Sequence, residues 1–263
     1  MKQRGLLIYA LFYLAFLYVP VLLLPLFSFN DSQFIAFPLS GFTTRWYAGL
    51  AADGAMHQAL ANSLKVGTAT ALLSTLLGLT AARAVTRYRL RARGVALSVI
   101  ALPLFIPDIV LGIALLLLLA ALELPLSLAG VVLGHMLVCI PLSMTVLIAR
   151  FEGFDRNLEE ASADLGEDGW MTFWRITFPL MLPGILASLL LTFITSFDEF
   201  LVAYFLSGGS ATLPVYIWGQ LRFPERLPMV LALGAIILSV SVALVVLAEY
   251  VRNLGVKKPM VGA

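Results

Sequence analysis

The sequence predicts an all-α, polytopic membrane protein with six transmembrane helices and both termini in the cytoplasm. Of its 263 residues, 61% are hydrophobic and only 12% are charged, about half the charged fraction of a typical soluble domain. Apolar runs long enough to cross a bilayer recur six times, and Lys and Arg gather on alternate connections. We therefore expect one integral transmembrane domain over residues 1–263, with lipid as a contact partner and no separate catalytic domain.

The six spans follow from the length of the apolar runs. A helix needs about 20 apolar residues to cross the hydrocarbon core. The stretches that qualify are about 6–28, 62–83, 95–121, 126–149, 184–206 and 229–250. They do not alternate as barrel strands would, and in lipid such runs must form helices to satisfy their own backbone. The first run is too long for a signal peptide and lacks a small-residue cleavage site, so we expect it to be retained.

The distribution of positive charge predicts the orientation, because Lys and Arg favour the cytoplasmic side of short connections. With six spans, thirteen of the 17 basic residues fall on one side and four on the other. The larger group comprises Lys2, Arg4, Arg83, Arg87, Arg89, Arg91, Arg93, Arg150, Arg156, Arg175, Arg252, Lys257 and Lys258. The smaller group comprises Arg45, Lys65, Arg222 and Arg226. Both termini are therefore expected to be cytoplasmic.

The connection between the fourth and fifth spans, residues 150–183, is predicted to form two short helices outside the membrane. Asn157 and Glu160 have the spacing of a capping box. Gly166 can adopt the left-handed conformation that ends a helix. One helix face gathers Leu158, Ala161, Ser162 and Leu165. A second, aromatic piece follows, and two prolines bracket the entry to the fifth span; these residues are Trp170, Phe173, Trp174, Ile176, Pro179 and Pro183.

The polar side of this connection is acidic. It carries Glu159, Glu160, Asp164, Glu167 and Asp168. A helix that lies on a bilayer favours Lys and Arg on its polar face, and anionic lipid would repel these carboxylates. A protein partner is therefore favoured over a membrane surface.

Three acids lie inside predicted spans: Asp108, Asp198 and Glu199. A charge at a helix centre costs about 2.5–3.5 kcal/mol on insertion scales, so such residues usually face a cavity or a partner. In a straight third span Asp108 would lie near the middle, and Asp198 would lie in the outer half of the fifth. Pro103 and Pro107 are expected to break the third helix and free carbonyls to line a cavity.

These acids predict a path for a cation, since no basic residue in the third to fifth spans neutralises them. Trp46, in the outer loop, could add a cation–π contact; a headgroup-level anchor is the alternative for this residue. For the acids, the alternative is that one of them pairs with a partner subunit or a buried hydroxyl. His135 is expected to be a neutral histidine packed against a neighbouring helix.

The sequence argues against chemistry of the chain's own. It has no Gly-rich Lys-Ser/Thr loop for ATP, so energy must come from a separate ATPase. Cys139 is a lone cysteine with no metal-ligand cluster, so we predict no metal and no bound cofactor. An intramembrane enzyme is the alternative from another class, with Asp108 and Asp198 as a dyad, but neither lies in a protease-like Gly-Asp motif. No catalytic residue and no nucleic-acid partner are predicted.

The cytoplasmic connection resembles the EAA loop of ATP-binding-cassette importer permeases. The resemblance rests on Glu160-Ala161-Ser162-Ala163-Asp164-Leu165-Gly166, then Phe173, Ile176, Pro179 and Pro183-Gly184-Ile185. It implies coupling helices that dock on an ATPase through Glu160, Ala161, Leu165, Gly166, Phe173 and Pro179. Ser162 replaces the usual second alanine, Phe178 replaces a common leucine, and Glu167-Asp168-Gly169 replaces a more neutral stretch.

Nearly the whole chain is similar to the PotC-type permeases of spermidine/putrescine importers. The matching segments are Gly41-Phe42-Thr43-Thr44-Arg45-Trp46-Tyr47, Tyr88-Arg89, Pro107-Asp108-Ile109-Val110 and Gly153-Phe154-Asp155. The resemblance implies a bacterial inner-membrane protein that imports spermidine, putrescine or both, with Trp46, Asp108, Asp198 and Glu199 on the substrate path. It also implies two ATPase copies that use ATP and Mg²⁺, a second related permease, and a periplasmic or lipid-anchored solute-binding protein. Iron, thiamine and amino acids remain alternative cargoes.

Overall fold

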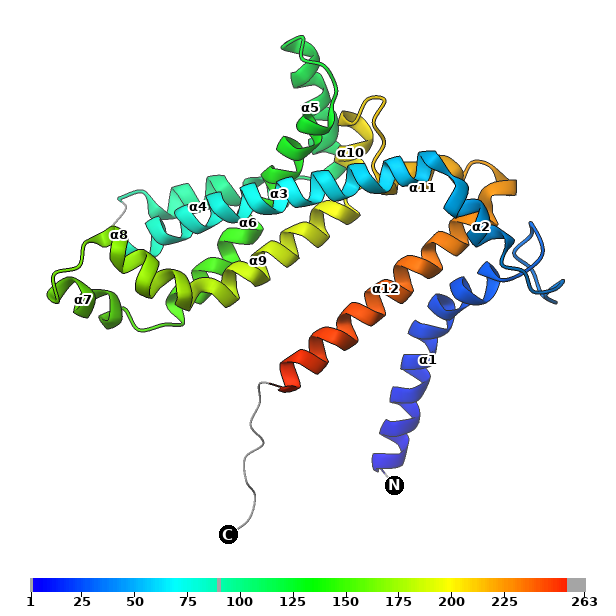
Figure 1. Ribbon diagram of the computed structural model, residues 1–263, viewed down its shortest axis with the longest axis horizontal. Coiled ribbons are helices and arrows are strands. Elements are labelled where there is room, and N and C mark those ends of the chain that lie inside the picture. The colour runs from blue at the N-terminus through cyan, green and yellow to red at the C-terminus, as the bar shows by residue number, and fades with distance from the viewer. Residues whose placement is uncertain (1, 89–90, 255–263) are drawn as a thin grey trace. The chain divides into compact units, whose positions relative to one another are not determined.

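The computed structural model describes residues 2–88 and 91–254 (Figure 1). Within these residues every regular element is a helix, apart from one isolated antiparallel bridge between Asn30 and Phe42. The helices are α1 (Lys2–Ser28), α2 (Arg45–Ala52), α3 (Gly54–Arg87), α4 (Arg93–Ala101), η1 (Leu102–Phe105), α5 (Asp108–Ala121), α6 (Leu128–Glu152), α7 (Asn157–Asp164), α8 (Gly169–Thr172), η2 (Phe173–Thr177), α9 (Phe178–Asp198), α10 (Leu201–Leu206), α11 (Leu213–Gln220), η3 (Pro224–Arg226) and α12 (Leu227–Leu254). Arg89, Lys257 and Lys258 from the charge count lie outside the described residues.

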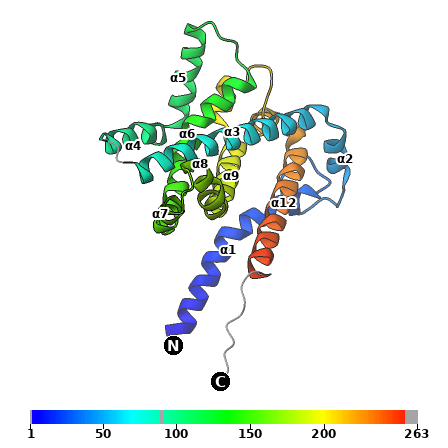
Figure 2. The same ribbon diagram turned by 60° about the vertical axis from the view of Figure 1, so that its left-hand side comes forward.

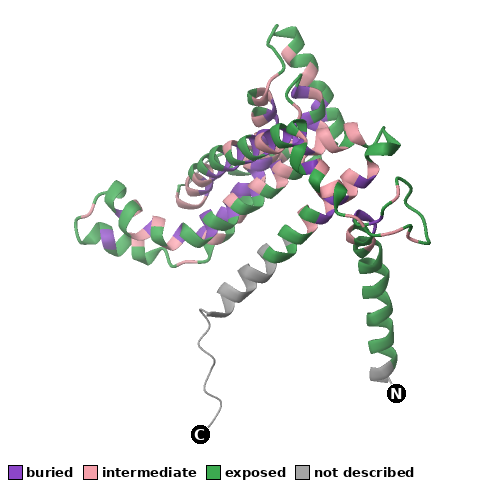
Figure 3. Cartoon of the chain, turned by 45° about the vertical axis from the view of Figure 1, so that its right-hand side comes forward, coloured by how far each residue is buried: buried purple, intermediate pink, exposed green. Residues whose placement is uncertain are grey.

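The chain forms two compact units. The first joins Met1–Gly54 to Ile217–Ala263, and the second is Ala55–Tyr216. In the first unit α1 and α12 pack together and α2 packs on α12. The second unit holds α3 to α10. Its buried residues include one cluster where α3, α6 and α9 meet and another where α3, α5, α6 and α10 meet (Figure 3).

Four described helices are long and apolar enough to cross a membrane, or five if α4 to α5 counts as one broken span. The described residues thus confirm an all-helical chain with several membrane-spanning helices. Predicted span 229–250 falls within α12. Most of α1 is exposed along its length (Figure 3), as expected of a helix whose solvent is lipid. The count of six and the cytoplasmic termini stay predictions.

The third predicted span is broken, as its two prolines indicated. α4 and α5 are bent by 101° relative to each other, and the bend is visible in both ribbon views (Figure 1; Figure 2). Pro103 is the second residue of the 3₁₀ turn η1, and Pro107 has an extended ψ of 134° just before α5. Asp108 therefore does not lie on the side of a straight helix, because it is the first residue of a new helix that leaves in another direction.

The fifth predicted span, 184–206, has different boundaries in the structure. A helix of 30 residues runs without interruption from Gly169 to Asp198, and a break then separates α9 from α10. The prediction of a separate second short helix is therefore wrong, since α8 and η2 are the first turns of the continuous helix Gly169–Asp198. Pro179 cannot bond to the carbonyl four residues earlier. The π-helical turn η2 just before α9 accommodates this loss.

A buried chain of hydroxyl groups joins α3, α6 and α9. Ser188 Oγ donates to Ser143 Oγ over 2.7 Å, and Thr75 Oγ1 lies 3.0 Å from Ser188 Oγ. A Cβ on Gly78 would meet Ser143 Oγ at 2.3 Å. Small residues let these helices approach closely, and the hydroxyl groups then satisfy one another, as is common between membrane helices.

Candidate functional site: a cavity at two helix breaks

A cavity of about 410 Å³ lies in the second unit, where α5 begins and α9 ends, beside the middle of α6. It is lined by Asp108, His135, Val138, Cys139, Thr195, Ser196, Asp198, Glu199, Phe200, Leu201 and Val202. All three acids predicted inside spans therefore line one cavity. The two breaks bring them together, because each break places its acid at a helix end and not on the side of a continuous helix.

Glu199 is held by backbone groups at the start of α10. Its Oε1 accepts a hydrogen bond from the Val202 N–H at 2.9 Å, and its Oε2 accepts one from the Ala203 N–H at 3.0 Å. A helix leaves its first N–H groups without intrahelical partners, and an anion at this end also complements the helix dipole. The Glu199 carboxylate thus closes the N-terminus that the break creates.

His135 supports the same carboxylate from α6. Its side chain is only 1% exposed, and its Nε2 lies 3.0 Å from Glu199 Oε2. Its Nδ1 lies 2.7 Å from the hydroxyl of Ser196 on α9. The predicted packing of His135 against a neighbouring helix is confirmed. The preceding Gly134 allows this approach, since a Cβ there would meet Val202 Cγ1 at 2.7 Å.

Asp108 and Asp198 differ from Glu199. Both are exposed in the described part of the chain, which records no hydrogen bond or ion pair for either carboxylate. One lies at the first residue of α5 and the other at the last residue of α9. The cavity therefore presents two free carboxylates and a third that is engaged. This arrangement can bind a cation and would repel an anion.

Trp46 belongs to the first unit, whereas the three acids belong to the second. Its Nε1 donates to the carbonyl oxygen of Asn30 at 2.9 Å, which fixes the ring at the start of α2. The guanidinium of Arg45 lies 4.2 Å from the ring centroid and pairs with Asp31 at 2.7 Å. One face of the indole thus already carries a cation–π contact within the chain.

Helix α7 forms where the sequence predicts it, but its start is capped differently. The predicted capping box of Asn157 and Glu160 is wrong. Asp155 Oδ1 accepts the Asn157 N–H at 2.9 Å, and Glu160 pairs with Arg156 at 3.0 Å instead of turning back to Asn157. Asp is as effective as Asn at accepting such N–H groups, so the neighbouring turn takes over the task.

The end of α7 confirms the predicted role of Gly166. Its φ is +88°, in the left-handed region. The Gly166 N–H bonds to the Ala163 carbonyl at 2.9 Å, and the Glu167 N–H bonds to the Ser162 carbonyl at 3.2 Å. This pair of bonds is a Schellman motif, which satisfies the last carbonyls of a helix and reverses the chain.

The predicted coupling residues lie in two places. Glu160, Ala161, Leu165 and Gly166 are exposed on α7 or at its end, and Leu165 is 86% exposed. Pro179 is exposed at the start of α9, while Phe173 is partly buried with the Arg83 guanidinium 4.8 Å from its ring centroid. Ser162, predicted on the same face as Leu165, instead points inward and lies 3.0 Å from the Thr172 hydroxyl.

The family "Binding-protein-dependent transport system inner membrane component" matches residues 74–253 of the sequence. This chain belongs to that family. The putrescine transport system permease protein PotI of Escherichia coli K12 is 35% identical over 231 residues, which cover 85% of this chain and 82% of the relative. The spermidine/putrescine transport system permease protein PotC of the same strain is 32% identical over 240 residues, 91% of this chain and 90% of the relative.

A solved structure shares the fold of this binding-protein-dependent transport component. It is a bacterial importer of the acidic polysaccharide alginate, with a TM-score of 0.70, 18% identity and coverage of 97% of both chains. Family and apolar helices together make the chain a multi-pass inner-membrane permease subunit, and not an enzyme.

Three contacts of this transport component are not predicted by the sequence. His135 packs between helices as expected, but it also lies 3.0 Å from a cavity acid. Glu159 belongs to the acidic side of the connection between the fourth and fifth spans, but only 15% of its side chain is exposed and it contacts α3 through Arg87. Thr177 donates a hydrogen bond to Glu159. No local spacing reveals these contacts, because the partners lie far apart along the chain.

Proposed function

We propose that the chain is the permease subunit of an ATP-driven importer that moves spermidine, putrescine or both across the inner membrane. One observation carries the proposal: Asp108 and Asp198 line a single cavity, and His135 is the one basic residue among the described residues that line it. The transport systems named for the two curated relatives carry the same kind of solute.

The chemistry of a polyamine suits this cavity. Its ammonium groups are separated by flexible methylene chains, so it needs spaced carboxylates that each bind it weakly enough to release it. Asp108 and Asp198 provide two such carboxylates at the helix breaks. Glu199 adds negative potential while it caps α10. Trp46 would meet the substrate in the outer loop, where an ammonium group competes with Arg45 for the indole face.

The rest of the assembly follows from the same proposal. Residues 1–263 form one transmembrane domain of six spans with cytoplasmic termini, and α7 docks on an ATPase through its exposed residues Glu160, Ala161, Leu165 and Gly166. Phe173 and Pro179 support that surface. Two ATPase copies supply energy from ATP and Mg²⁺, a second related permease completes the pore, and a solute-binding protein delivers the cargo.

Uptake by the reconstituted importer tests this function. Asp108→Asn and Asp198→Asn should each reduce uptake of labelled spermidine and putrescine by about tenfold or more, because a hydrogen bond between two charged groups contributes about that factor. The ATPase should still copurify with both variants. Glu123→Gln, an exposed acid outside the cavity, is the matched control and should transport normally. Normal uptake by both aspartate variants would exclude this path.

A further inference from the structure

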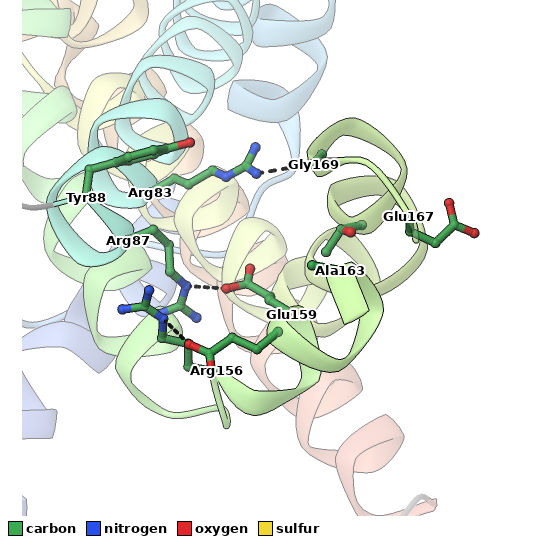
Figure 4. Close-up of a pocket in the computed structure, with 10 residues that line it drawn as sticks. Arg83, Arg87, Tyr88, Arg156, Glu159, Ala163, Glu167 and Gly169 are labelled. Atoms are coloured by element: carbon green, nitrogen blue, oxygen red, sulfur yellow. Dashed lines mark hydrogen bonds and ion pairs between the residues drawn. The ribbon is translucent and has the colours of Figure 1, made fainter. Parts of the chain in front are cut away.

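Two arginines one turn apart near the end of α3 face the α7–α8 segment across a pocket of about 250 Å³ (Figure 4). The nearer contact is an ion pair in which Arg87 Nε lies 2.5 Å from Glu159 Oε2. The side chains are 13% and 15% exposed, respectively. In the other arginine–carboxylate pairs of the described residues the arginine is 47–64% exposed. Water and salt therefore screen the Arg87–Glu159 pair least.

The Glu159 carboxylate also reaches the fifth span. Its Oε1 accepts a hydrogen bond from the Thr177 hydroxyl at 2.6 Å, and Thr177 is fully buried in η2. One carboxylate thus bridges α3 and the π-helical turn that leads into α9. Glu159 is on α7 itself. A displacement of α7 must therefore either move Arg87 and Thr177 with it or break their contacts with Glu159.

Arg87 extends the link to α6. Its guanidinium lies 4.8 Å from the ring centroid of Phe154 and 5.2 Å from that of Phe151, and it donates to the Phe151 carbonyl at 3.4 Å. A cation is favoured at this position, because the end of a helix carries unpaired carbonyl groups. Four elements therefore meet at one ion pair: α3, α6, α7 and η2.

The covalent connections of α7 could not transmit force as directly. Residues 153–156 before it and 165–168 after it are turns and bends with mostly exposed side chains. Apart from the contacts of Glu159, the buried polar contact that the described residues provide to α7 is the one between Ser162 and Thr172. Coupling between distant sites needs packed or charged contacts that have discrete arrangements, and the Arg87–Glu159 pair is such a contact.

We propose that Arg87 and Glu159 form an internal link that carries displacement of α7 into α3, α6 and the fifth span. The proposal rests on the proposed function, in which α7 docks on an ATPase. It assigns a positioning role to a glutamate that faces inward, next to Glu160, which faces outward to the partner. Through this link, α7 moves as one body with the ends of α3 and α6 and with η2.

The test uses the complete importer, with ATPase, partner permease and solute-binding protein, reconstituted in vesicles. The variants are Glu159→Gln, Arg87→Gln and the double variant. The readout is the stimulation of ATP hydrolysis by the solute-binding protein, which requires communication across the membrane whatever the cargo is. Each single variant should lower the stimulation about tenfold, since removing one member leaves the other, little-exposed charge without its partner, which costs about that factor or more. Basal hydrolysis and copurification of the ATPase should persist.

The double variant separates a link from two independent effects. If the two residues act through each other, the stimulation of ATP hydrolysis falls no further in the double variant than in either single variant. A loss equal to the product of the single losses, or normal stimulation in both single variants, would overturn the proposal. Glu152→Gln is the matched control, because Glu152 forms an exposed pair with Arg93 over 3.8 Å, and it should leave stimulation unchanged.

A further variant keeps the proposal testable if Glu159→Gln prevents assembly of the importer. If Glu159→Gln no longer copurifies with the ATPase, Thr177→Val removes only one hydroxyl from the same carboxylate and should lower stimulation in the same direction. Unchanged stimulation in Thr177→Val together with lost assembly in Glu159→Gln would refute the link. Failure of the polyamine assignment is distinguishable, because the unmodified importer would then move no polyamine while its stimulation by the solute-binding protein remained.

Discussion

Glu199 and its chain neighbour Asp198 stand at the same helix break but in opposite electrostatic situations. Both oxygens of Glu199 accept N–H groups of α10, and His135 Nε2 lies 3.0 Å from one of them. Asp198 ends α9, and the described residues provide it with no hydrogen-bonding or ionic partner. The break thus converts two adjacent acids into one that is engaged within the fold and one that has no partner among the described residues.

This difference predicts opposite effects on stability and transport. Glu199→Ala should lower the free energy of unfolding by about 2 kcal/mol, because α10 loses its cap and a buried histidine loses its partner. Asp198→Ala should change it by less than about 0.5 kcal/mol while it reduces uptake. Thermal unfolding of the detergent-solubilised protein measures both. Equal destabilisation by the two variants would contradict the division of roles.

The close approach of α3 and α6 predicts a large effect of one added methyl group. Gly78→Ala should destabilise the protein by about 1–3 kcal/mol, because the new Cβ would meet Ser143 Oγ at 2.3 Å in a buried hydroxyl network. Gly94→Ala is the control, since its Cβ meets open space. It should leave stability unchanged or raise it by up to about 1 kcal/mol. Denaturation midpoints compare the two.

The end of α7 predicts a local defect. Gly166→Ala should cost about 1–2 kcal/mol, because φ is +88° there and a Cβ is strained in that region. The strain should loosen the Schellman turn and raise the rate of proteolysis within residues 157–168. Gly169→Ala, at an ordinary helical position with open space around it, should be cleaved like the unmodified protein. Identical cleavage of both variants would show that the turn tolerates the side chain.

The exposed face of α7 predicts sensitivity to charge. Glu160→Lys should weaken copurification of the ATPase and lower the amount of solute moved per ATP hydrolysed, because it reverses the charge of an exposed residue at the proposed docking surface. Glu152→Lys reverses an equally exposed acid at the end of α6 and should have no such effect. Normal copurification and normal transport per ATP in Glu160→Lys would argue against docking through this face.

Much of the site could be predicted because its signals are local. An acid in an apolar run is energetically costly, which singles out Asp108, Asp198 and Glu199. Two prolines, Pro103 and Pro107, indicate the break before α5. The capping of α7 was mispredicted at Asn157 because Asp155 offers an equally good acceptor two residues earlier. The length of the fifth helix was misjudged because a π-helical turn accommodates Pro179, which sequence rules treat as a boundary.

The amino-acid order alone predicts a helical membrane protein with acids in its spans and a helical loop that faces a partner. Hydropathy and charge bias are sums over neighbouring residues and need no knowledge of contacts. Tertiary structure alone decides which acids are free and which are engaged. Glu199 meets His135, and Glu159 meets Arg87, across long stretches of chain. Such pairings depend on how helices approach and on which backbone N–H groups a break leaves open, and no local pattern encodes either.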